Sequence, residues 1–291
     1  MVAMFRDRHG IEVGYRCWDV ADPAACVVLS HGASEHSGRY DRFALALNDA
    51  GFAAYALDHR GHGLTAPATG PGRIGPLGGA ALIDDVDELG DRAQDEHPTV
   101  PIVLFGHSLG SLIALSYAAV HADRLDALAL CGVPAAPDTV AAVAEQFVHV
   151  PDEMRDQPGP ALTGFNAAFE PARTPYDWLT RDADEVDRYI ADPLCGDDQP
   201  LTLGFTAELF GILAPALASL GALSMPVLLI AGDHDPAAEM GENIRVLGAA
   251  MEDAGVDVTG RVYPGARHEL LNETNRDEVT ADIVGWVREQ L

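Results

Sequence analysis

The chain has 291 residues, and its 18 basic side chains are all arginine because the sequence contains no lysine. Mechanisms that need a lysine ammonium group are therefore excluded, among them Schiff-base chemistry, pyridoxal phosphate enzymes and the lysine-containing phosphate loop of nucleotide hydrolases. A net charge of −27 makes binding to nucleic acid or anionic lipid unfavourable, because both depend on clustered basic residues.

No stretch of the sequence reaches the roughly 18 apolar residues of a membrane-spanning helix, and the amino terminus lacks the apolar run of a signal peptide. We therefore expect a cytoplasmic protein without a transmembrane segment. At most, a predicted helical cap of residues 133–223 makes transient contact with lipid interfaces. The cysteines are far apart and form no C-x-x-C pair, so we expect them to be reduced and structural. They are Cys17, Cys26, Cys131 and Cys195.

Short apolar segments that end in glycine or a polar turn predict buried parallel strands. These segments are residues 25–30, 53–57, 102–105, 127–131, 227–231 and 258–263. Amphipathic stretches predict helices at residues 39–50, 79–96, 109–121, 239–254 and 275–290. Because strands and helices alternate, the sequence predicts an α/β fold with a doubly wound, mostly parallel sheet.

Residues 133–223 interrupt this alternation, since they have no convincing strand and carry 15 acidic side chains against four arginines. We therefore expect an α/β core of residues 1–132 and 224–291, with a helical cap of residues 133–223 inserted into it. An acidic outer face and an apolar inner face would let the cap line a substrate pocket. The candidate lining residues are Phe147, Phe165, Trp178 and Phe205. The alternative is a helical subdomain that packs only on itself.

The pentapeptide GHSLG, residues 106–110, follows a predicted strand and opens a predicted helix. This is the context of a nucleophile elbow, a sharp turn that holds a serine in a strained backbone conformation with its hydroxyl exposed. Ser108 is therefore the candidate nucleophile, and the alternative is an unrelated glycine-rich turn. At the start of the helix, the backbone N–H of Leu109 is expected to donate to a developing oxyanion.

A serine nucleophile needs a base, and the base needs a carboxylate that orients it. In this type of fold the acid and then the histidine follow the serine along the chain, which selects His268 in the segment GARHELLNE. The alternative for His268 is an exposed loop histidine. The preceding predicted strand ends in GDHDP, which offers Asp233 and Asp235 as acids, and spacing alone favours neither.

The loop after residues 25–30 reads HGASEHSGRY. Gly32 lets the backbone approach a substrate, and we expect the N–H of Ala33 to be the second oxyanion donor. We expect His31, Glu35 and His36 to order this loop by hydrogen bonding, the alternatives being metal ligands or general acids.

The segment DHRGHG places His59 and His62 at the spacing of an H-x-x-H metal pair. We expect both to be structural. The segment HELLN at His268 lacks the second histidine of a zinc-protease helix. We therefore expect neither a metal nor a cofactor.

Together, the segments HGASEHSGRY, DHRGHG, GHSLG, GDHDP and GARH resemble the monoacylglycerol lipase and lysophospholipase branch of the α/β-hydrolases, which shares ancestry with the S33 prolyl aminopeptidases. EVDRYIADPLCG is similar to the lid of that family. The resemblance implies an α/β-hydrolase fold, Asp235 as the acid and His268 as the base, and it implies oxyanion amides at Ala33 and Leu109. The chain has ASEH where AGEH is commoner, and it departs from the mammalian lipases in its lid.

The resemblance implies a serine hydrolase for esters of a single acyl chain, with a monoacylglycerol as the expected small-molecule substrate. The alternatives, in order, are a lysophospholipase or general carboxylesterase, a prolyl aminopeptidase, and a non-catalytic ligand receptor. The acidic cap disfavours a phosphate headgroup. Leu109 stands where prolyl aminopeptidases have tryptophan, and Ser108 disfavours epoxide hydrolases and dehalogenases, which have aspartate at the elbow.

Overall fold

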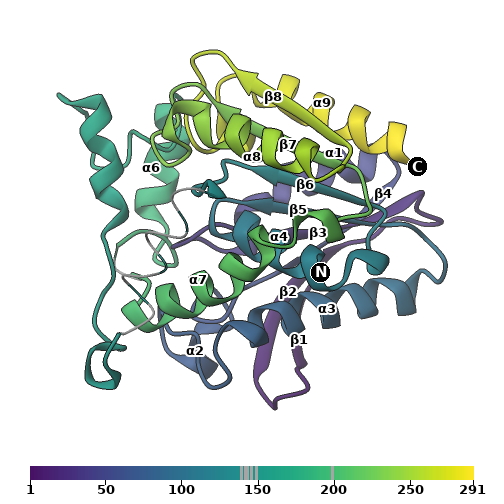
Figure 1. The fold of residues 1–291 in the computed structure, drawn as a ribbon, viewed down its shortest axis with the longest axis horizontal. Helices are drawn as coiled ribbons and strands as arrows, with labels where there is room; N and C mark the ends of the chain where they lie inside the picture. The colour runs from purple at the N-terminus through teal and green to yellow at the C-terminus, as the bar shows by residue number, and fades with distance from the viewer. Residues whose placement is uncertain (138–139, 141–143, 145–146, 148–149, 198–199) are drawn as a thin grey trace.

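The computed structural model describes residues 1–137, 140, 144, 147, 150–197 and 200–291. An eight-stranded sheet in the order β1-β2-β4-β3-β5-β6-β7-β8 forms its centre, and helices cover both faces (Figure 1). The strands are β1 (Val2–Arg6), β2 (Glu12–Trp18), β3 (Ala25–Ser30), β4 (Phe52–Leu57), β5 (Ile102–His107), β6 (Ala127–Cys131), β7 (Val227–Gly232) and β8 (Val258–Tyr263). The predicted α/β fold with a mostly parallel sheet is confirmed.

The helices follow the predicted alternation. They are α1 (Asp41–Asp49), α2 (Ala66–Thr69), α3 (Gly79–Glu96), α4 (Leu109–Val120), α6 (Ala183–Ala191), α7 (Leu203–Leu217), α8 (Glu242–Asp253) and α9 (Arg276–Gln290). Short 3-10 turns lie at η1 (Ser37–Tyr40), η2 (Ala122–Arg124), η3 (Asp152–Met154), η4 (Leu162–Phe169), η5 (Leu220–Ala222), η6 (Glu239–Gly241) and η7 (Leu270–Asn272). The helix predicted from residue 239 begins at Glu242, because Met240 and Gly241 have positive φ angles of 56° and 82°.

The two edges of the sheet differ from the prediction. The sequence analysis missed β1 and β2, which pair antiparallel with each other and join β4 antiparallel. In β2 polar and apolar residues alternate, so it lacks the apolar runs that identified the other strands, although it lies between β1 and β4 and is largely buried. β1 has a short apolar run, VAMF, but it is a mostly exposed edge strand. At the opposite edge, β8 was expected to be buried, and this was wrong. Its residues from Thr259 to Val262 are exposed, because an edge strand has a neighbour on one side only.

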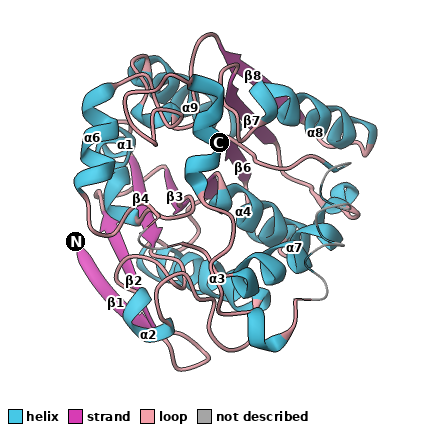
Figure 2. Ribbon diagram, turned by 90° about the vertical axis from the view of Figure 1, so that its left-hand side faces the viewer, coloured by secondary structure: helices cyan, strands magenta, loops and turns pink. Residues whose placement is uncertain are grey.

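Two hydrophobic clusters cover the two faces of the sheet. Helices α1 and α9 cover one face of the sheet, and α3, α4 and α8 cover the other (Figure 2). Phe43 and Ile283 belong to the cluster on the first face, and Leu82 and Leu247 to the cluster on the second. Successive strand residues alternate between the clusters, as pleated strands require: Val28 faces one cluster and its neighbours in β3 face the other. This packing brings the loops after β3, β5, β7 and β8 to one end of the sheet.

The described residues of the segment predicted as a cap, 133–223, lie between β6 and β7 in the chain, and residues 150–197 lie beyond one end of the strands, at the left of Figure 1. Its helix α7 packs on α3 and α4. A third hydrophobic cluster joins cap residues such as Trp178 and Tyr189 to Ala237 of the core. Within the described part of the cap, strand pairing is limited to an isolated bridge between Pro158 and Thr202.

The four cysteines are unpaired and buried. Among the described residues, the helices are too short or too polar to cross a lipid bilayer.

Candidate active site

Ser108 lies at the turn between β5 and α4, with a φ of 51° and a ψ of −120°. This backbone conformation is strained for a residue with a side chain. The turn also requires glycines on both sides. A Cβ on Gly106 would lie 2.4 Å from the carbonyl oxygen of Gly110, and a Cβ on Gly110 would lie 2.0 Å from the carbonyl oxygen of Ser30. The sequence therefore folds into a sharp elbow here, and Ser108 lines a cavity.

His268, in the loop after β8, is hydrogen-bonded to Asp235, in the loop after β7. Nδ1 of His268 lies 2.8 Å from Oδ2 and 2.9 Å from Oδ1 of Asp235. The backbone N–H groups of Ala237 and Ala238 also donate to Oδ1 of Asp235, at 2.9 and 3.2 Å. Because the carboxylate accepts all of these bonds, Nδ1 of His268 carries the proton and Nε2 is left as the basic nitrogen.

The Asp235 carboxylate also controls the charge of His268. Burial by itself lowers the pKa of His268, but the negative charge of Asp235 and its hydrogen bond outweigh burial, so the pKa of His268 is raised above its ordinary value. Gly132, which follows β6, leaves room for this pair. A Cβ on Gly132 would lie 3.2 Å from Nδ1 of His268 and 3.3 Å from Oδ2 of Asp235.

The second candidate acid, Asp233, has other partners. Its Oδ1 accepts a hydrogen bond from the backbone N–H of Gly265, at 2.6 Å, and lies 2.6 Å from Nδ1 of His234. Asp233 is also half-exposed, whereas Asp235 is fully buried. Of the two acids that spacing left open, the structure brings Asp235 to His268.

Ala33 and Leu109 line the same cavity as Ser108. Leu109 is the first residue of α4, so its N–H has no acceptor in the preceding turn. In the part of the chain that the structure describes, neither the N–H of Ala33 nor that of Leu109 donates a hydrogen bond. Both amides are therefore available to a ligand in the cavity.

Side chains hold the Ala33 amide in place through its neighbour Gly32. The N–H of Gly32 donates to Oε1 of Glu35, at 2.5 Å, and its carbonyl oxygen lies 2.7 Å from Nδ1 of His31. Nε2 of His31 accepts from the N–H of His59, at 3.0 Å, so Nδ1 carries the proton and donates to Gly32. Since the Gly32 carbonyl and the Ala33 N–H share one planar peptide group, this bond also sets the direction of the N–H.

The segment DHRGHG supports this loop. Oδ1 of Asp58 accepts from the N–H of Ser37, at 2.7 Å, and Nε2 of His59 lies 2.9 Å from the hydroxyl oxygen of Ser30. Nδ1 of His62 donates to the carbonyl oxygen of Arg60, at 2.9 Å. Burial lowers the pKa of His62 to about 3, so the ring is neutral. The expected structural role of His59 and His62 agrees with these contacts.

A buried cluster of charges that the sequence analysis did not identify lies beside His268. The guanidinium of Arg39 contacts Oε2 of Glu35 at 2.7 Å and both carboxylate oxygens of Glu269. Burial raises the pKa of the two carboxyl groups, but the charge of Arg39 outweighs it and keeps both pKa values below their ordinary range. Arg39 and Glu269 are 230 positions apart, so no local pattern could have joined them.

Aromatic rings flank His268 on two sides. Its ring centroid lies 4.7 Å from that of His107, in the elbow sequence, and 4.8 Å from that of Trp178, in the cap. Burial and the neighbouring His268 lower the pKa of His107 to about 4, so this ring is neutral near pH 7. The position of His107 directly before Ser108 was the available signal for its place in the site.

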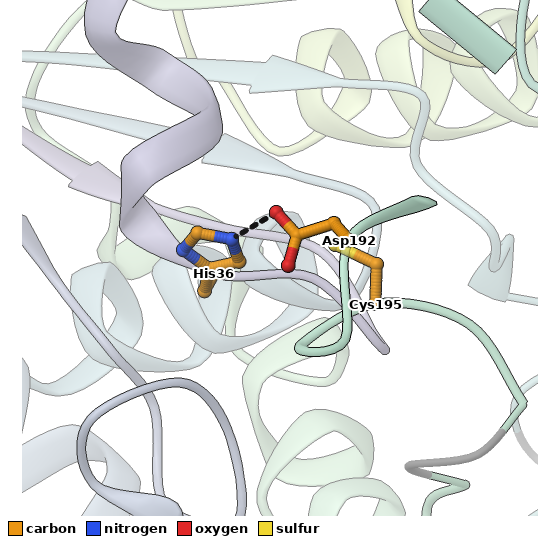
Figure 3. A group of neighbouring side chains, drawn as sticks. All are labelled: His36, Asp192 and Cys195. Carbon is orange, nitrogen blue, oxygen red and sulfur yellow. Dashed lines mark hydrogen bonds and ion pairs between the residues drawn. The ribbon is translucent and has the colours of Figure 1, made fainter. Parts of the chain in front are cut away.

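His36, Asp192 and Cys195 form a group of potential metal ligands (Figure 3). Nδ1 of His36 accepts from the N–H of Gly38, at 3.1 Å, so Nε2 carries the proton and donates to Oδ2 of Asp192, at 2.9 Å. Burial raises the pKa of the Cys195 thiol, which keeps it protonated. These bonds use both ring nitrogens of His36. The group therefore links the loop after β3, which carries His36, to the cap segment that carries Asp192.

The cavity beside Ser108 has a volume of about 480 Å³. Its wall is largely apolar and comes from both the core and the cap: Leu109, Leu112, Pro134, Leu162, Phe165, Trp178, Leu179, Leu201, Leu209, Phe210 and Ala237. Glu35, Asp197 and Glu269 supply acidic groups to the same wall.

Of the four expected lining residues, Phe165 and Trp178 line the cavity. The expectation was wrong for Phe205. Its side chain is fully buried in the core cluster, 5.8 Å from the ring of His62, because it points from α7 toward the core. Phe147 is not among the described lining residues, and its ring stacks on that of Phe210 at 5.9 Å.

Comparison with known proteins places these features in a family. A family model described as serine aminopeptidase, S33, matches residues 21–275. The chain is 32% identical to a monoacylglycerol lipase of Mycolicibacterium smegmatis, over 99% of both chains. It is also similar to the solved structure of a thermostable carboxyl esterase from Bacillus coagulans in complex with glycerol, with a TM-score of 0.87, 29% identity and coverage of 99% and 98%. For a monoacylglycerol lipase of Paleococcus ferrophilus the TM-score is 0.72 at 26% identity, with coverage of 97% and 100%.

Proposed function

We infer the substrate of this chain from its family: the chain belongs to the serine aminopeptidase S33 family and is a serine hydrolase of the α/β-hydrolase fold, an esterase or lipase. We propose that it hydrolyses carboxylic esters of a single acyl chain and that its natural substrate is a monoacylglycerol. The names of the relatives from M. smegmatis and P. ferrophilus support this substrate class.

The observation that carries the proposal is that Ser108, His268 and two free backbone amides border one apolar cavity. In the proposed mechanism Nε2 of His268 takes the proton of the Ser108 hydroxyl, whose oxygen attacks the ester carbonyl carbon. The amides of Ala33 and Leu109 donate to the resulting oxyanion. The carbon–oxygen bond to the alcohol then breaks, and the alcohol takes the proton from His268.

The second half of the reaction repeats these roles with water. The acyl group is held on Ser108 as an ester, and His268 takes a proton from a water molecule that attacks it. Collapse of the second tetrahedral intermediate releases the fatty acid and returns the proton to Ser108. The Asp235 carboxylate stabilises the imidazolium in both steps. No cofactor enters this sequence.

The size and polarity of the cavity support a single acyl chain. A volume of about 480 Å³ lies in the range of sites for one small ligand, roughly 300–1,000 Å³. The apolar wall suits an alkyl chain. Longer triacylglycerols would have to leave two chains outside.

The charges disfavour two of the rival substrates. Among the described residues that line the cavity there is no arginine, and Arg39, which contacts two of the lining residues, is paired with both of them, Glu35 and Glu269, so it is not free for a lysophospholipid phosphate. Because Glu35 and Glu269 are paired with Arg39, their carboxylates are also not free to bind the amino group of an aminopeptidase substrate. Asp197 also lines the cavity, and this acid is the feature that keeps aminopeptidase activity as the second candidate.

A substrate panel tests the proposal. The wild-type enzyme and Ser108→Ala would be assayed on a 1-monoacylglycerol, a lysophosphatidylcholine and a p-nitrophenyl ester of the same acyl length, and on prolyl p-nitroanilide. We expect the highest kcat/KM among the lipids for the monoacylglycerol, and labelling of wild-type but not Ser108→Ala protein by a fluorophosphonate. A higher kcat/KM on the lysolipid or the anilide would replace the proposed substrate.

A further inference from the structure

The cap residue Trp178 contacts His268 through both its ring and its backbone. The two ring centroids lie 4.8 Å apart with an interplanar angle of 33°, and the N–H of His268 lies 3.5 Å from the carbonyl oxygen of Trp178. His107 covers a second side of the imidazole at 4.7 Å. The rotation of His268 is therefore limited by Asp235 at Nδ1 and by two rings.

The segment Asp177–Asp182, here called the strap, is bonded to the loop that carries His268 along its whole length. The N–H of Glu269 donates to the carbonyl oxygen of Leu179 at 2.7 Å, and the hydroxyl of Thr180 donates to that of Asn272 at 2.9 Å. At the end of the strap, Nε of Arg181 contacts Oε2 of the fully buried Glu273 at 2.8 Å. Although it belongs to the cap in sequence, the strap is part of the framework of the site.

The indole N–H of Trp178 is buried and has no hydrogen-bond partner within the described residues. A buried tryptophan N–H usually donates a hydrogen bond. Because that of Trp178 does not, hydrogen bonding cannot be the reason for a tryptophan at this position. What Trp178 offers His268 is the face of its ring. A cation within about 6 Å of such a face is stabilised by the negative charge above the ring.

We propose that Trp178 is a positioning residue that orients the His268 imidazole and stabilises the imidazolium formed during catalysis. This inference rests on the proposed role of His268 as the base. It assigns to the cap a part in the chemical step, in addition to lining the cavity.

Several charged groups face His268 and shift its protonation equilibrium. Asp235, Glu269 and Glu35 favour the imidazolium, whereas burial disfavours it. His107, whose pKa is lowered to about 4, is neutral when His268 titrates and adds no charge. Arg39 offsets the two glutamates. Replacing Trp178 by leucine keeps the site apolar and these groups unchanged, and it removes the aromatic face.

The test compares Trp178→Phe and Trp178→Leu on p-nitrophenyl acetate, whose short acyl group makes little use of the apolar wall. We expect Trp178→Leu to lower kcat by about 2- to 30-fold with little change in KM, because the lost stabilisation is felt in the transition state. The acid limb of the kcat/KM profile should move to lower pH. Trp178→Phe, which keeps an aromatic face, should retain most of kcat and the pH profile.

Trp286→Leu in α9 is the control, because Trp286 is also buried, at 7% exposed against 2% for Trp178, and it packs in the core cluster and does not line the cavity. It should lower thermal stability and leave kcat per folded molecule unchanged.

A second measurement is the rate at which a fluorophosphonate labels Ser108. In Trp178→Leu this rate should fall in parallel with kcat.

Two results would overturn the inference: a change in KM alone, or equal loss of kcat in Trp178→Phe and Trp178→Leu. The first would make Trp178 a pocket wall, and the second would show that an aromatic face does not account for the effect. Turnover that survives His268→Ala would instead contradict the proposed function, and this is measured without any Trp178 variant.

Discussion

The guanidinium of Arg39 forms a bidentate ion pair with the carboxylate of Glu269, the residue that follows His268, and Nη2 lies 2.8 Å from Oε2. Nη1 of Arg39, which contacts Glu269, also donates to Oε2 of Glu35 in the loop after β3, at 2.7 Å. The side chains of Arg39 and Glu269 are 10% and 5% exposed, so solvent screens the pair little. This ion pair joins the loop after β3 to the loop after β8 and thus connects the two parts of the candidate site.

Arg39→Met should destabilise the protein by about 3–5 kcal/mol, because it leaves two buried carboxylates without a cation. Unfolding in urea, followed by circular dichroism, measures the change. Arg42→Met is the control. Arg42 is 44% exposed, and its ion pair with Glu185 should contribute less than about 1 kcal/mol. Equal losses in the two variants would show that Arg39 does not hold the buried carboxylates.

Asp235→Asn should lower kcat by about 10³- to 10⁴-fold, because an amide at this position favours the wrong tautomer of His268. Asp233→Asn should change kcat by no more than a few-fold, since Asp233 bonds to Gly265 and His234. Steady-state kinetics with matched circular dichroism spectra compare the two. If Asp233→Asn lost most of its kcat and Asp235→Asn retained it, Asp233 would be the acid.

Activity should fall on acidification, because the base must be neutral to take the Ser108 proton. The pKa of His268 is raised by Asp235 above its ordinary value of about 6.5, so the acid limb of the kcat/KM profile should have its midpoint above that value. Glu269→Gln removes a nearby negative charge and should move the midpoint to lower pH. A midpoint unchanged by this substitution would show that Glu269 does not act on the charge of His268.

The length of the substrate's acyl chain should control kcat/KM, because the apolar wall of the cavity would bury that chain. Each added methylene that is buried should contribute about 0.8 kcal/mol to binding. We therefore expect kcat/KM on p-nitrophenyl esters to rise from acetate to chains of about eight to twelve carbons and then to fall, with triacylglycerols poor throughout. A series from C2 to C16 measures this. A steady decline from acetate would contradict the acyl-binding cavity and the monoacylglycerol proposal.

Gly132→Ala should lower kcat even when the rate is calculated per folded molecule. Its φ of 58° is strained for alanine, and the added Cβ would press on both His268 and Asp235. We expect a loss of about tenfold or more in kcat, measured beside a thermal melt. Gly285→Ala in α9 is the control, since its Cβ would have no neighbour within 4 Å, and it should stabilise the helix by about 0.5–1 kcal/mol. Wild-type kcat in Gly132→Ala would show that this contact is not tight.

The sequence by itself determined the order of the parallel strands and helices and the loops on which the chemically reactive residues lie. It could do so because these features depend on local patterns: apolar runs mark buried strands, and glycines beside Ser108 mark a sharp turn. Strand β2 was missed because its polar and apolar residues alternate, and β1 was missed because its short apolar run lies on an exposed edge of the sheet.

Tertiary structure decided the relations between residues that are distant along the chain. Spacing could not distinguish Asp233 from Asp235, and the fold brings only Asp235 to His268. Composition indicated Phe165 and Phe205 equally as pocket residues, but α7 turns Phe205 into the core. The ion pair of Arg39 with Glu269 and the ring contact of Trp178 with His268 depend on how loops meet at the end of the sheet. Such meetings follow from the packing of the whole core, which no short segment encodes.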